Sequence, residues 1–395
     1  MEETATTRPA SPDVPLASGR WVAIVLYVVV AFLYWLSMYL YLPTLPTYIQ
    51  GKVHDLAVVG SVLSMFGLLQ AIVRLPVGIG ADWLNWHKPF VIAGLVMTGA
   101  GAWIMGYASN AEALHIGRAL TGLGAGAWAV IVVGFSNLFP ARKAVQASAA
   151  VTLVSTVARM ASTGVTGTLN QVGGYELAFV LAAAGSALGL VLMLAVREPP
   201  RPPQSPSLQG IGHLVARRSV WLPSALNALS QYVVWAAPFG FVPILARQLG
   251  ATDTTQSLLL TLNLAATVIG NLLATAAGGR LRSRHLIILS FVLLSAGVGA
   301  TALATAMPAI FIGLILMGLS QGIGYPVLIG LSIEKVKSDE RTTAMGLHQA
   351  VYALGMFGGP WLSGILAQAI GLQPMFGLTA GACLVLGLFG AKWLE

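Results

Sequence analysis

Residues 21–42 read Trp21-Val-Ala-Ile-Val-Leu-Tyr-Val-Val-Val-Ala-Phe-Leu-Tyr-Trp-Leu-Ser-Met-Tyr-Leu-Tyr-Leu42, a predominantly apolar run without a charged side chain. A helix needs about 20 apolar residues to cross the roughly 30 Å of hydrocarbon in a bilayer. The run also lacks the alternation of apolar and polar residues that marks a lipid-facing strand. Because only helices and closed barrels satisfy their backbone hydrogen bonds in lipid, this stretch predicts a membrane-spanning helix.

Similar apolar runs recur along the whole chain. They make 56% of the 395 residues hydrophobic and only 9% charged, a composition that excludes an ordinary soluble protein. The fold class predicted from the sequence is therefore an all-α polytopic membrane protein with twelve transmembrane helices. The predicted spans are 21–42, 58–80, 90–108, 112–135, 144–169, 177–196, 221–245, 255–277, 286–306, 309–331, 342–369 and 374–393.

The formal net charge of +8 comes from basic residues that gather on one side of the predicted membrane. Two of the 21 Lys and Arg fall in loops on the other side and three fall within spans, which leaves sixteen on the side of the N-terminus. Because cytoplasmic loops carry an excess of Lys and Arg, both termini are predicted to be cytoplasmic in a multi-pass protein of a prokaryote-like cell (inner or plasma) membrane. The basic charge then reports topology, and no nucleic-acid partner is expected. The sixteen are Arg8, Arg20, Lys88, Arg142, Lys143, Arg197, Arg201, Arg217, Arg218, Arg280, Arg282, Arg284, Lys335, Lys337, Arg341 and Lys392.

The longest polar interruption divides six spans from six. We expect a disordered cytoplasmic tail at 1–20, a first six-helix half at 21–196, a cytoplasmic linker at 197–220 and a second half at 221–395. Sliding one half by 196 positions pairs identical residues, among them Gly122 with Gly318, Gly126 with Gly322 and Ser136 with Ser332. An internal duplication into two pseudo-symmetric halves explains this register. Such halves place a substrate site near the bilayer midplane and predict a transporter that works by alternating access.

Three motifs resemble those of the major facilitator superfamily. After span 2 the chain carries Gly78-x-x-x-Asp82, similar to the superfamily's loop between helices 2 and 3. Span 4 carries Arg118 four residues before Gly122 on a glycine-rich face, and span 11 carries Gly355-x-x-x-Gly359-Pro360, like the glycine-proline motif of antiporters. The resemblance implies a secondary transporter of this fold, in which the Asp82 loop acts as a latch near Arg341. Close helix packing is the alternative interpretation of the glycines.

The resemblance also implies that helices 1, 4, 7 and 10 line a central cavity. Their aromatic and amide side chains are then expected to surround a partly apolar organic substrate. An arginine near the bilayer centre costs about 3 kcal/mol on the mildest scale, so Arg159 in span 5 and Arg118 are candidates for binding an anionic group, while Arg74 is assigned a structural role near the cytoplasmic loop. The predicted cavity residues are Tyr34, Trp35, Arg118, Trp128, Arg159, Gln231, Tyr232, Trp235, Gln321 and Tyr325.

Candidates for proton coupling are few, because all thirteen Asp and Glu fall in tails, loops or span ends. A drug–proton antiporter usually relies on a buried carboxylate, which this chain lacks at the midplane. Glu112, His115 and Arg118 recur every three residues on helix 4, which fits a proton relay and an interfacial polar edge equally well. His348 in span 11 either couples protons or donates to a backbone carbonyl.

The leading hypothesis is a secondary active transporter that exports a small organic or amphipathic compound with proton coupling. The alternatives are an organic-anion transporter that uses Arg159 and Arg118, and a lipid flippase or scramblase. An enzyme is not expected, because the sequence carries no nucleotide loop, zinc-type histidine pair or nucleophile with its base. The single cysteine, Cys383, gives no disulfide or metal cluster. We expect a monomer without cofactor or metal, whose partners are a small-molecule substrate, protons or another coupling ion, and the lipid bilayer.

Overall fold

The computed structural model describes residues 18–84, 86–196, 217–278, 280–337 and 341–394, and these residues form helices joined by short connections. The first half contains α1 (Ser18–Tyr39), η1 (Leu42–Thr44), α2 (Leu45–Val53), α3 (Leu56–Leu84), α4 (Lys88–Gly106), α5 (Ala111–Ala125), α6 (Trp128–Ser136), η2 (Ala141–Lys143) and α7 (Ala144–Ala195). The second half contains α9 (Arg218–Ala236), η3 (Ala237–Phe241), α10 (Val242–Gln248), α11 (Asp253–Ala277), α12 (Ser283–Ala302), α13 (Met307–Glu334), α14 (Arg341–Ile370) and α15 (Leu372–Ala391).

Eleven helical segments in the described part of the chain are long and apolar enough to cross a membrane. One of them, the 52-residue α7, is interrupted at Gly173 and Gly174, where the backbone leaves helical geometry. Gly174 has a φ of 68°, a left-handed conformation that glycine adopts without the steric cost of a side chain. The two parts of α7 are therefore separate crossings, and the predicted total of twelve is confirmed.

Three predicted spans contain breaks that hydropathy did not reveal. Span 4 is divided between α5 and α6, with Gly126 and Ala127 between them. Spans 1 and 7 break at equivalent places: α1 is followed by η1 and α2, and α9 is followed by the π-helical turn η3 and α10. Proline lies in the first turn of η1, α2, η3 and α10, where it has no helical hydrogen bond to lose. The matched breaks agree with the internal duplication.

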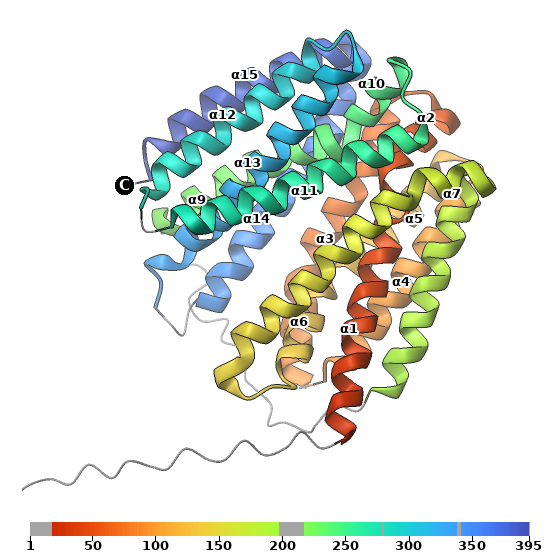
Figure 1. Ribbon diagram of the computed structural model, residues 1–395, viewed down its shortest axis with the longest axis vertical. Helices are drawn as coiled ribbons and strands as arrows, with labels where there is room; N and C mark the ends of the chain where they lie inside the picture. Colours follow the sequence, from red (N-terminus) through yellow and green to blue (C-terminus); the bar gives the residue numbers. More distant parts are fainter. Residues whose placement is uncertain (1–17, 85, 197–216, 279, 338–340, 395) are drawn as a thin grey trace, which may run out of the picture.

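The two halves are close together at one end of the bundle and diverge toward the other (Figure 1). We call the end that carries Arg20, Lys88, Lys143, Arg218 and Arg284 the basic face, and the end that carries α2 and α10 the opposite face. Two helix pairs join the halves, α3 with α14 and α7 with α11. In both pairs the two helices run antiparallel, and each pair forms a seam that runs from the opposite face toward the basic face.

Some sequence predictions concern residues beyond this description. Residues 1–17 of the predicted tail and 197–216 of the predicted linker lie outside the described residues, as do the side chains of Asp82 and Arg341 in the proposed latch. The domain boundaries and the latch therefore stay predictions.

Candidate functional site

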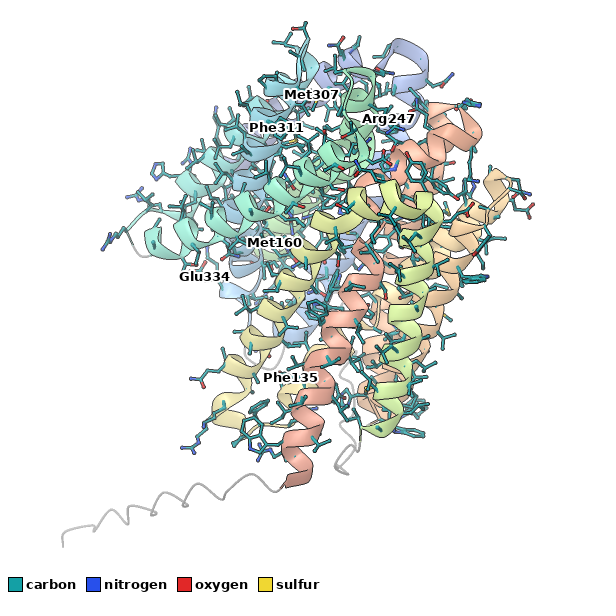
Figure 2. The ribbon with its side chains drawn as sticks, turned by 45° about the vertical axis from the view of Figure 1, so that its right-hand side comes forward. Phe135, Met160, Arg247, Met307, Phe311 and Glu334 are labelled. Carbon is teal, nitrogen blue, oxygen red and sulfur yellow. The ribbon has the colours of Figure 1, made fainter. Side chains whose placement is uncertain are left out.

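The central feature of the first half is an aromatic–arginine cluster, formed by Tyr34, Trp35 and Tyr39 of α1, Trp128 of α6 and Arg159 of α7. Figure 2 shows Met160, the residue after Arg159, about midway between Phe135 toward the basic face and Arg247 at the opposite face. The cluster thus lies near mid-height between the two faces of the bundle.

Arg159 is held by aromatic faces and by its own helix. Its guanidinium carbon lies 4.9 Å from the ring centroid of Trp35 and 5.7 Å from that of Tyr39, within the range of cation–π attraction. Nε donates to the backbone oxygen of Ser155 at 3.3 Å, and Nη2 donates to Oγ1 of Thr156 at 3.3 Å. Among the described residues no carboxylate pairs with it. The half-buried guanidinium keeps donors available for an anion.

Trp35 joins the members of the cluster. Its ring lies edge-on to those of Tyr34, Tyr39 and Trp128, with centroid distances of 5.7, 5.6 and 5.2 Å. The buried Nε1 atom of Trp35 has no hydrogen-bond partner in the described part of the protein. Because a buried polar group without a partner is costly, this donor is available for a ligand atom.

The second half contributes tyrosines to the space between the halves. Nη1 of Arg74 on α3 donates to the hydroxyl of Tyr352 on α14 at 2.6 Å. The rings of Tyr325 and Tyr352 lie 6.0 Å apart, and Tyr325 is within electrostatic reach of both Arg74 and Arg159. The sequence interpretation assigned Arg74 to the neighbourhood of the Asp82 loop, whereas the structure directs its guanidinium across the seam to the second half. Arg74 and Arg159, both from the first half, therefore interact electrostatically with Tyr325.

Gln70 extends this polar face of α3. It lies four residues before Arg74 and four after Phe66, so the three side chains share one side of the helix. Gln70 is 8% exposed, and its Oε1 atom has no hydrogen-bond partner among the described residues. Phe66 on the same side stacks on Trp235 of α9, with centroids 5.1 Å apart. The residues predicted from the sequence to line the cavity do not include Gln70.

Two predicted cavity residues are enclosed within the first half. Arg118 is 2% exposed, with its guanidinium 4.4 Å from the ring centroid of Phe66 and within electrostatic reach of Tyr41. Tyr34 is fully buried and donates its hydroxyl to the backbone oxygen of Gly124 at 2.7 Å. In this conformation neither side chain is accessible, so Arg159 is better placed than Arg118 to meet a ligand.

The predicted cavity residues of the second half divide in a similar way. Gln231 and Trp235 are buried, at 4% and 8% exposure. The hydroxyl of Tyr232 lies 3.1 Å from Oγ of Ser363 on α14, within the same half. Gln321 and Tyr325 on α13 are half-buried, and the Gln321 amide oxygen accepts from Ser230 at 3.4 Å. Gln321 and Tyr325 are therefore the more accessible pair.

The candidate coupling residues are not connected to one another by hydrogen bonds in the described structure. Glu112 is exposed, and His115 on the same helix has its Nε2 atom 2.8 Å from Ser61 Oγ and its Nδ1 atom 2.7 Å from the backbone oxygen of Ala111. His348 is fully buried. The amide nitrogen of Asn227 lies 2.8 Å from its Nε2 atom, and Ser224 Oγ lies 3.0 Å from its Nδ1 atom. Two side chains of α9 therefore contact the His348 ring, in place of the backbone carbonyl that one of the two alternatives for this residue required.

The motif glycines lie mostly at close helix contacts. A Cβ atom at Gly122 would lie 2.7 Å from the backbone oxygen of Phe66. Cβ atoms at Gly355 and Gly359 would overlap the backbone oxygens of Ala228 and Tyr232 on α9. Gly78 has no atom within 4 Å of such a Cβ, and Pro360 is buried inside α14. Packing therefore accounts for Gly122, Gly355 and Gly359, and leaves Gly78 unexplained.

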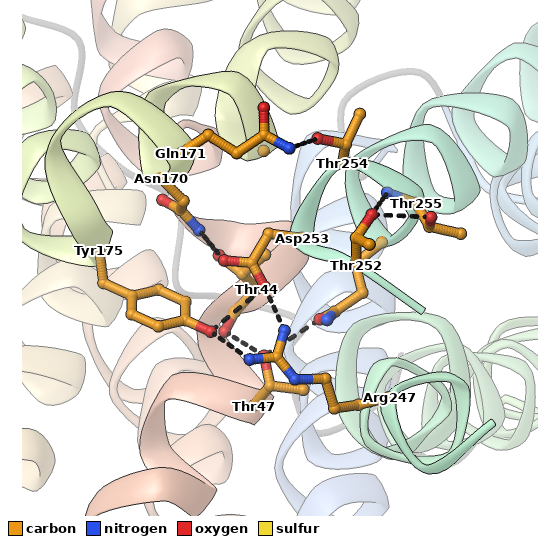
Figure 3. Close-up of polar contacts among 12 residues, drawn as sticks. Thr44, Thr47, Asn170, Gln171, Tyr175, Arg247, Thr252, Asp253, Thr254 and Thr255 are labelled. Carbon is orange, nitrogen blue, oxygen red and sulfur yellow. Dashed lines mark hydrogen bonds and ion pairs between the residues drawn. The ribbon is translucent and has the colours of Figure 1, made fainter. Parts of the chain in front are cut away.

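A polar network at the opposite face was not found by sequence reasoning (Figure 3). Asp253, in the first turn of α11, pairs with Arg247 of α10 and accepts from Asn170 at 3.0 Å and from Tyr175 at 3.3 Å. Asn170 and Tyr175 belong to α7 in the first half. The sequence had shown Asp253 only as one of the carboxylates at span ends, since its partners are distant along the chain.

Twelve membrane crossings in two matched halves define an α-helical membrane protein of the two-half transporter type. The sequence profile of the Major Facilitator Superfamily matches residues 27–245 and 224–395, so the chain belongs to this superfamily of transporters.

Two curated relatives are similar to the chain, one over a short segment and one over most of its length. The inner membrane transport protein YajR of Escherichia coli is 35% identical over 101 residues, which are 25% of this chain and only 22% of YajR. The multidrug resistance protein MdtH of Aeromonas salmonicida is 22% identical over 311 residues, which are 73% of this chain and 77% of MdtH.

Solved structures share the fold. A bacterial homologue of the human lysosomal transporter Spinster, in an inward-facing and unoccupied conformation, matches with a TM-score of 0.77 at 15% identity over 95% of this chain and 97% of that chain. At this identity the likeness concerns the fold alone.

Proposed function

We propose that the protein transports an organic anion with aromatic or apolar parts, bound between the halves beside Arg159. The observation that carries this proposal is the half-buried Arg159 guanidinium at mid-depth, which lies against Trp35 and Tyr39 without a carboxylate partner among the described residues. A charge placed there is expensive unless it has a functional partner. An anionic group meets the guanidinium, and the aromatic rings bind the apolar part of the same molecule.

Further groups support this site. Arg74 adds a second positive charge near Tyr325, and the Trp35 indole nitrogen and the Gln70 amide oxygen supply an unused donor and an unused acceptor. Arg118, buried against Phe66, has a supporting role in this proposal, while Gln321 and Tyr325 form the wall contributed by the second half.

The orientation is part of the proposal. Because positively charged segments stay in the cytoplasm, the basic face is taken as cytoplasmic, in the cell membrane, with both termini inside. The halves then meet at the outer face and diverge toward the cytoplasm, which is an inward-facing arrangement (Figure 1).

A second candidate function is the export of amphipathic compounds by proton antiport. The similarity to a multidrug resistance protein over 73% of this chain favours it. In this alternative His348, with Ser224 and Asn227 around its ring, is the coupling group. Glu112 and His115 stay candidates for an outer proton path.

Reconstitution into liposomes that contain a pH-sensitive dye tests both candidates. Internal pH and substrate uptake are recorded while aromatic carboxylates, neutral amphiphiles and lipophilic cations are added in turn, with empty liposomes as the control. Arg159→Gln is expected to reduce anion uptake by at least tenfold, whereas Arg159→Lys keeps part of it because the charge remains. Arg218→Gln at the basic face is the matched control for loss of one arginine. Undiminished anion uptake by Arg159→Gln would overturn the anion proposal, and export of cations by both variants would favour the second candidate.

A further inference from the structure

An apolar groove lies between α1 and the first part of α7, which diverge toward the basic face (Figure 1). It encloses a volume of about 430 Å³. Leu153 and Val157 on its α7 side are 65% and 53% exposed, so the groove opens at the surface of the protein. Its walls are formed by Val28, Val29, Phe32, Leu153, Val154 and Val157.

The groove is separate from the site beside Arg159. Val157 and Arg159 are two residues apart on α7, which corresponds to a rotation of about 200° around the helix axis. Arg159 therefore lies on the far side of α7 from Val157, against the rings of Trp35 and Tyr39. A substrate bound beside Arg159 does not occupy the groove, whose exposed apolar walls face the lipid.

The lining decides what kind of group fits the groove. Pockets for drug-sized ligands have volumes of about 300–1,000 Å³ and combine apolar walls with a few polar groups that orient the ligand. This groove has a volume in that range, but its lining within the described part of the chain offers neither a donor nor an acceptor side chain. A polar molecule would lose its hydrogen bonds to water there without replacing them. The chemistry of the walls therefore selects a hydrocarbon chain.

Positive charge gathers where α1 and α7 begin, at the basic-face end of the groove. Arg20, in the first turn of α1, donates from Nε to the backbone oxygen of Leu138, in the segment between α6 and η2. This bond places the start of α1 beside η2, whose Arg142 and Lys143 are exposed directly before α7. Neither α1, nor residues 137–143, nor α7 before its break contains an Asp or Glu that would offset these charges.

The distance from the basic residues to the groove matches one leaflet of a bilayer. At a rise of 1.5 Å per residue, Val28 lies about 12 Å along α1 from Arg20, and Leu153 lies about 15 Å along α7 from Lys143. Half of a hydrocarbon core roughly 30 Å thick is about 15 Å. The exposed Val25 continues the apolar surface of α1 between the two levels. A phospholipid whose headgroup lies beside the basic residues therefore places the end of an acyl chain in the groove.

We propose that this groove is a binding site for an anionic phospholipid of the leaflet at the basic face. The phosphate group lies beside Arg20 and Lys143, and one acyl chain fills the space between α1 and α7. Basic pockets between membrane helices recognise anionic headgroups by such charges. Membrane topology by itself accounts for basic residues at this face, but it requires no apolar groove behind them. The bound lipid stabilises the first half and does not meet the transported substrate.

Photocrosslinking tests the site in the unaltered protein. The protein is reconstituted in bilayers that contain phosphatidylglycerol with a diazirine near the end of one acyl chain, and crosslinked residues are identified by mass spectrometry. Label on 28–32 and 153–157 is expected to exceed at least fivefold the label on Leu289 and Val292, which are exposed on α12 at a similar depth from the basic face. Equal labelling of both regions would overturn the proposal, because ordinary boundary lipid contacts both.

Native mass spectrometry of variants tests the headgroup contact. Arg20→Gln combined with Lys143→Gln is expected to lower the ratio of phosphatidylglycerol-bound to free protein at least fivefold. Arg280→Gln combined with Lys335→Gln removes the same charge from exposed positions at the basic face of the second half, and is expected to leave the ratio unchanged. Phosphatidylcholine with the same chains is expected to bind at least fivefold less to the wild type. Equal binding of the two lipids would overturn the proposal.

Two variants of α7 test the acyl chain. Val157→Trp fills the groove and is expected to lower the phosphatidylglycerol-bound ratio at least fivefold, whereas Val165→Trp places the same ring at an exposed position outside the groove and keeps the ratio. An unchanged ratio in Val157→Trp, displacement of the lipid by inorganic phosphate alone, or a dimer of the chain in place of the lipid-bound monomer would overturn the proposal. Because no substrate is added, failure here is distinct from failure of the Arg159 experiment.

Discussion

The two seams between the halves are built differently. Along α3 and α14, backbones approach through small residues: a Cβ at Gly67 would lie 2.6 Å from the backbone carbon of Met356, and one at Gly364 would lie 2.7 Å from the backbone oxygen of Leu56. Along α7 and α11, polar side chains face each other, and Thr163 and Thr261 bring their hydroxyls to 2.9 Å. Small residues allow close van der Waals contact in lipid, where apolar attraction between helices is weak.

The difference lies in the side chains that accompany the backbone contact. A Cβ at Gly167 would lie 2.3 Å from the Cα atom of Thr254, so backbones also approach closely along α7 and α11. Hydrogen bonds can be exchanged for bonds to water as the halves part, so the α7/α11 seam is suited to opening and closing. The first seam also has polar contacts: the Leu56 N–H donates to the amide oxygen of Gln368 at 2.9 Å near the opposite face, and Arg74 donates to Tyr352 at the deeper end.

Of the substitutions on the two seams, Gly67→Leu is expected to lower folding stability most. The added side chain overlaps the α14 backbone, which cannot move aside without separating the helices, so folding stability falls by about 1–3 kcal/mol or more. Thermal unfolding in detergent measures the change. Gly299→Leu is the control, because no atom lies within 4 Å of a Cβ on that α12 glycine. Equal effects of both substitutions would mean that close packing on α14 is not what Gly67 provides.

Tyr352→Phe tests the hydrogen bond between Arg74 and Tyr352 and is expected to lower folding stability by an intermediate amount. It removes the hydroxyl that accepts from Arg74, and hydrogen bonds to charged groups contribute about 1.5–3 kcal/mol. A double-mutant cycle with Arg74→Gln, measured by thermal unfolding, gives the coupling between the two side chains. Tyr232→Phe removes a hydroxyl whose contact with Ser363 involves neutral groups, and is expected to destabilise less. A coupling near zero for Arg74 and Tyr352 would contradict the contact.

Thr163→Val is expected to have the smallest effect. The substitution keeps the side-chain shape but removes one neutral hydrogen bond to Thr261, worth about 0.5–1.5 kcal/mol. Spin labels placed on the exposed Val172 of the first half and Leu303 of the second measure the distance between the halves at the opposite face, which should increase slightly. Thr152→Val is the control, because the Thr152 hydroxyl donates to Ser148 within its own helix. A larger shift in the control than in Thr163→Val would show that the seam hydroxyls do not join the halves.

Sequence reasoning succeeded where one helix contains all the necessary information. Hydropathy identified the spans, and the register between Gly122 and Gly318 indicated two related halves. It predicted that Arg159 lies near the middle of its span, because depth is inferred from position within a span. It did not find the break between α5 and α6 or the contact of Arg74 with Tyr352, since both depend on what the neighbouring helices present.

The sequence by itself determined the class of this protein, its twelve crossings and its twofold internal repeat, because apolar length, charge asymmetry and internal similarity are properties of the linear chain. Only the tertiary structure decided that Arg118 is enclosed while Arg159 stays half-buried beside Trp35, and that Asp253 meets Asn170, 83 residues away along the chain. Such contacts depend on how each helix is rotated and which helix packs beside it. Side-chain packing sets that rotation, and no single span encodes it.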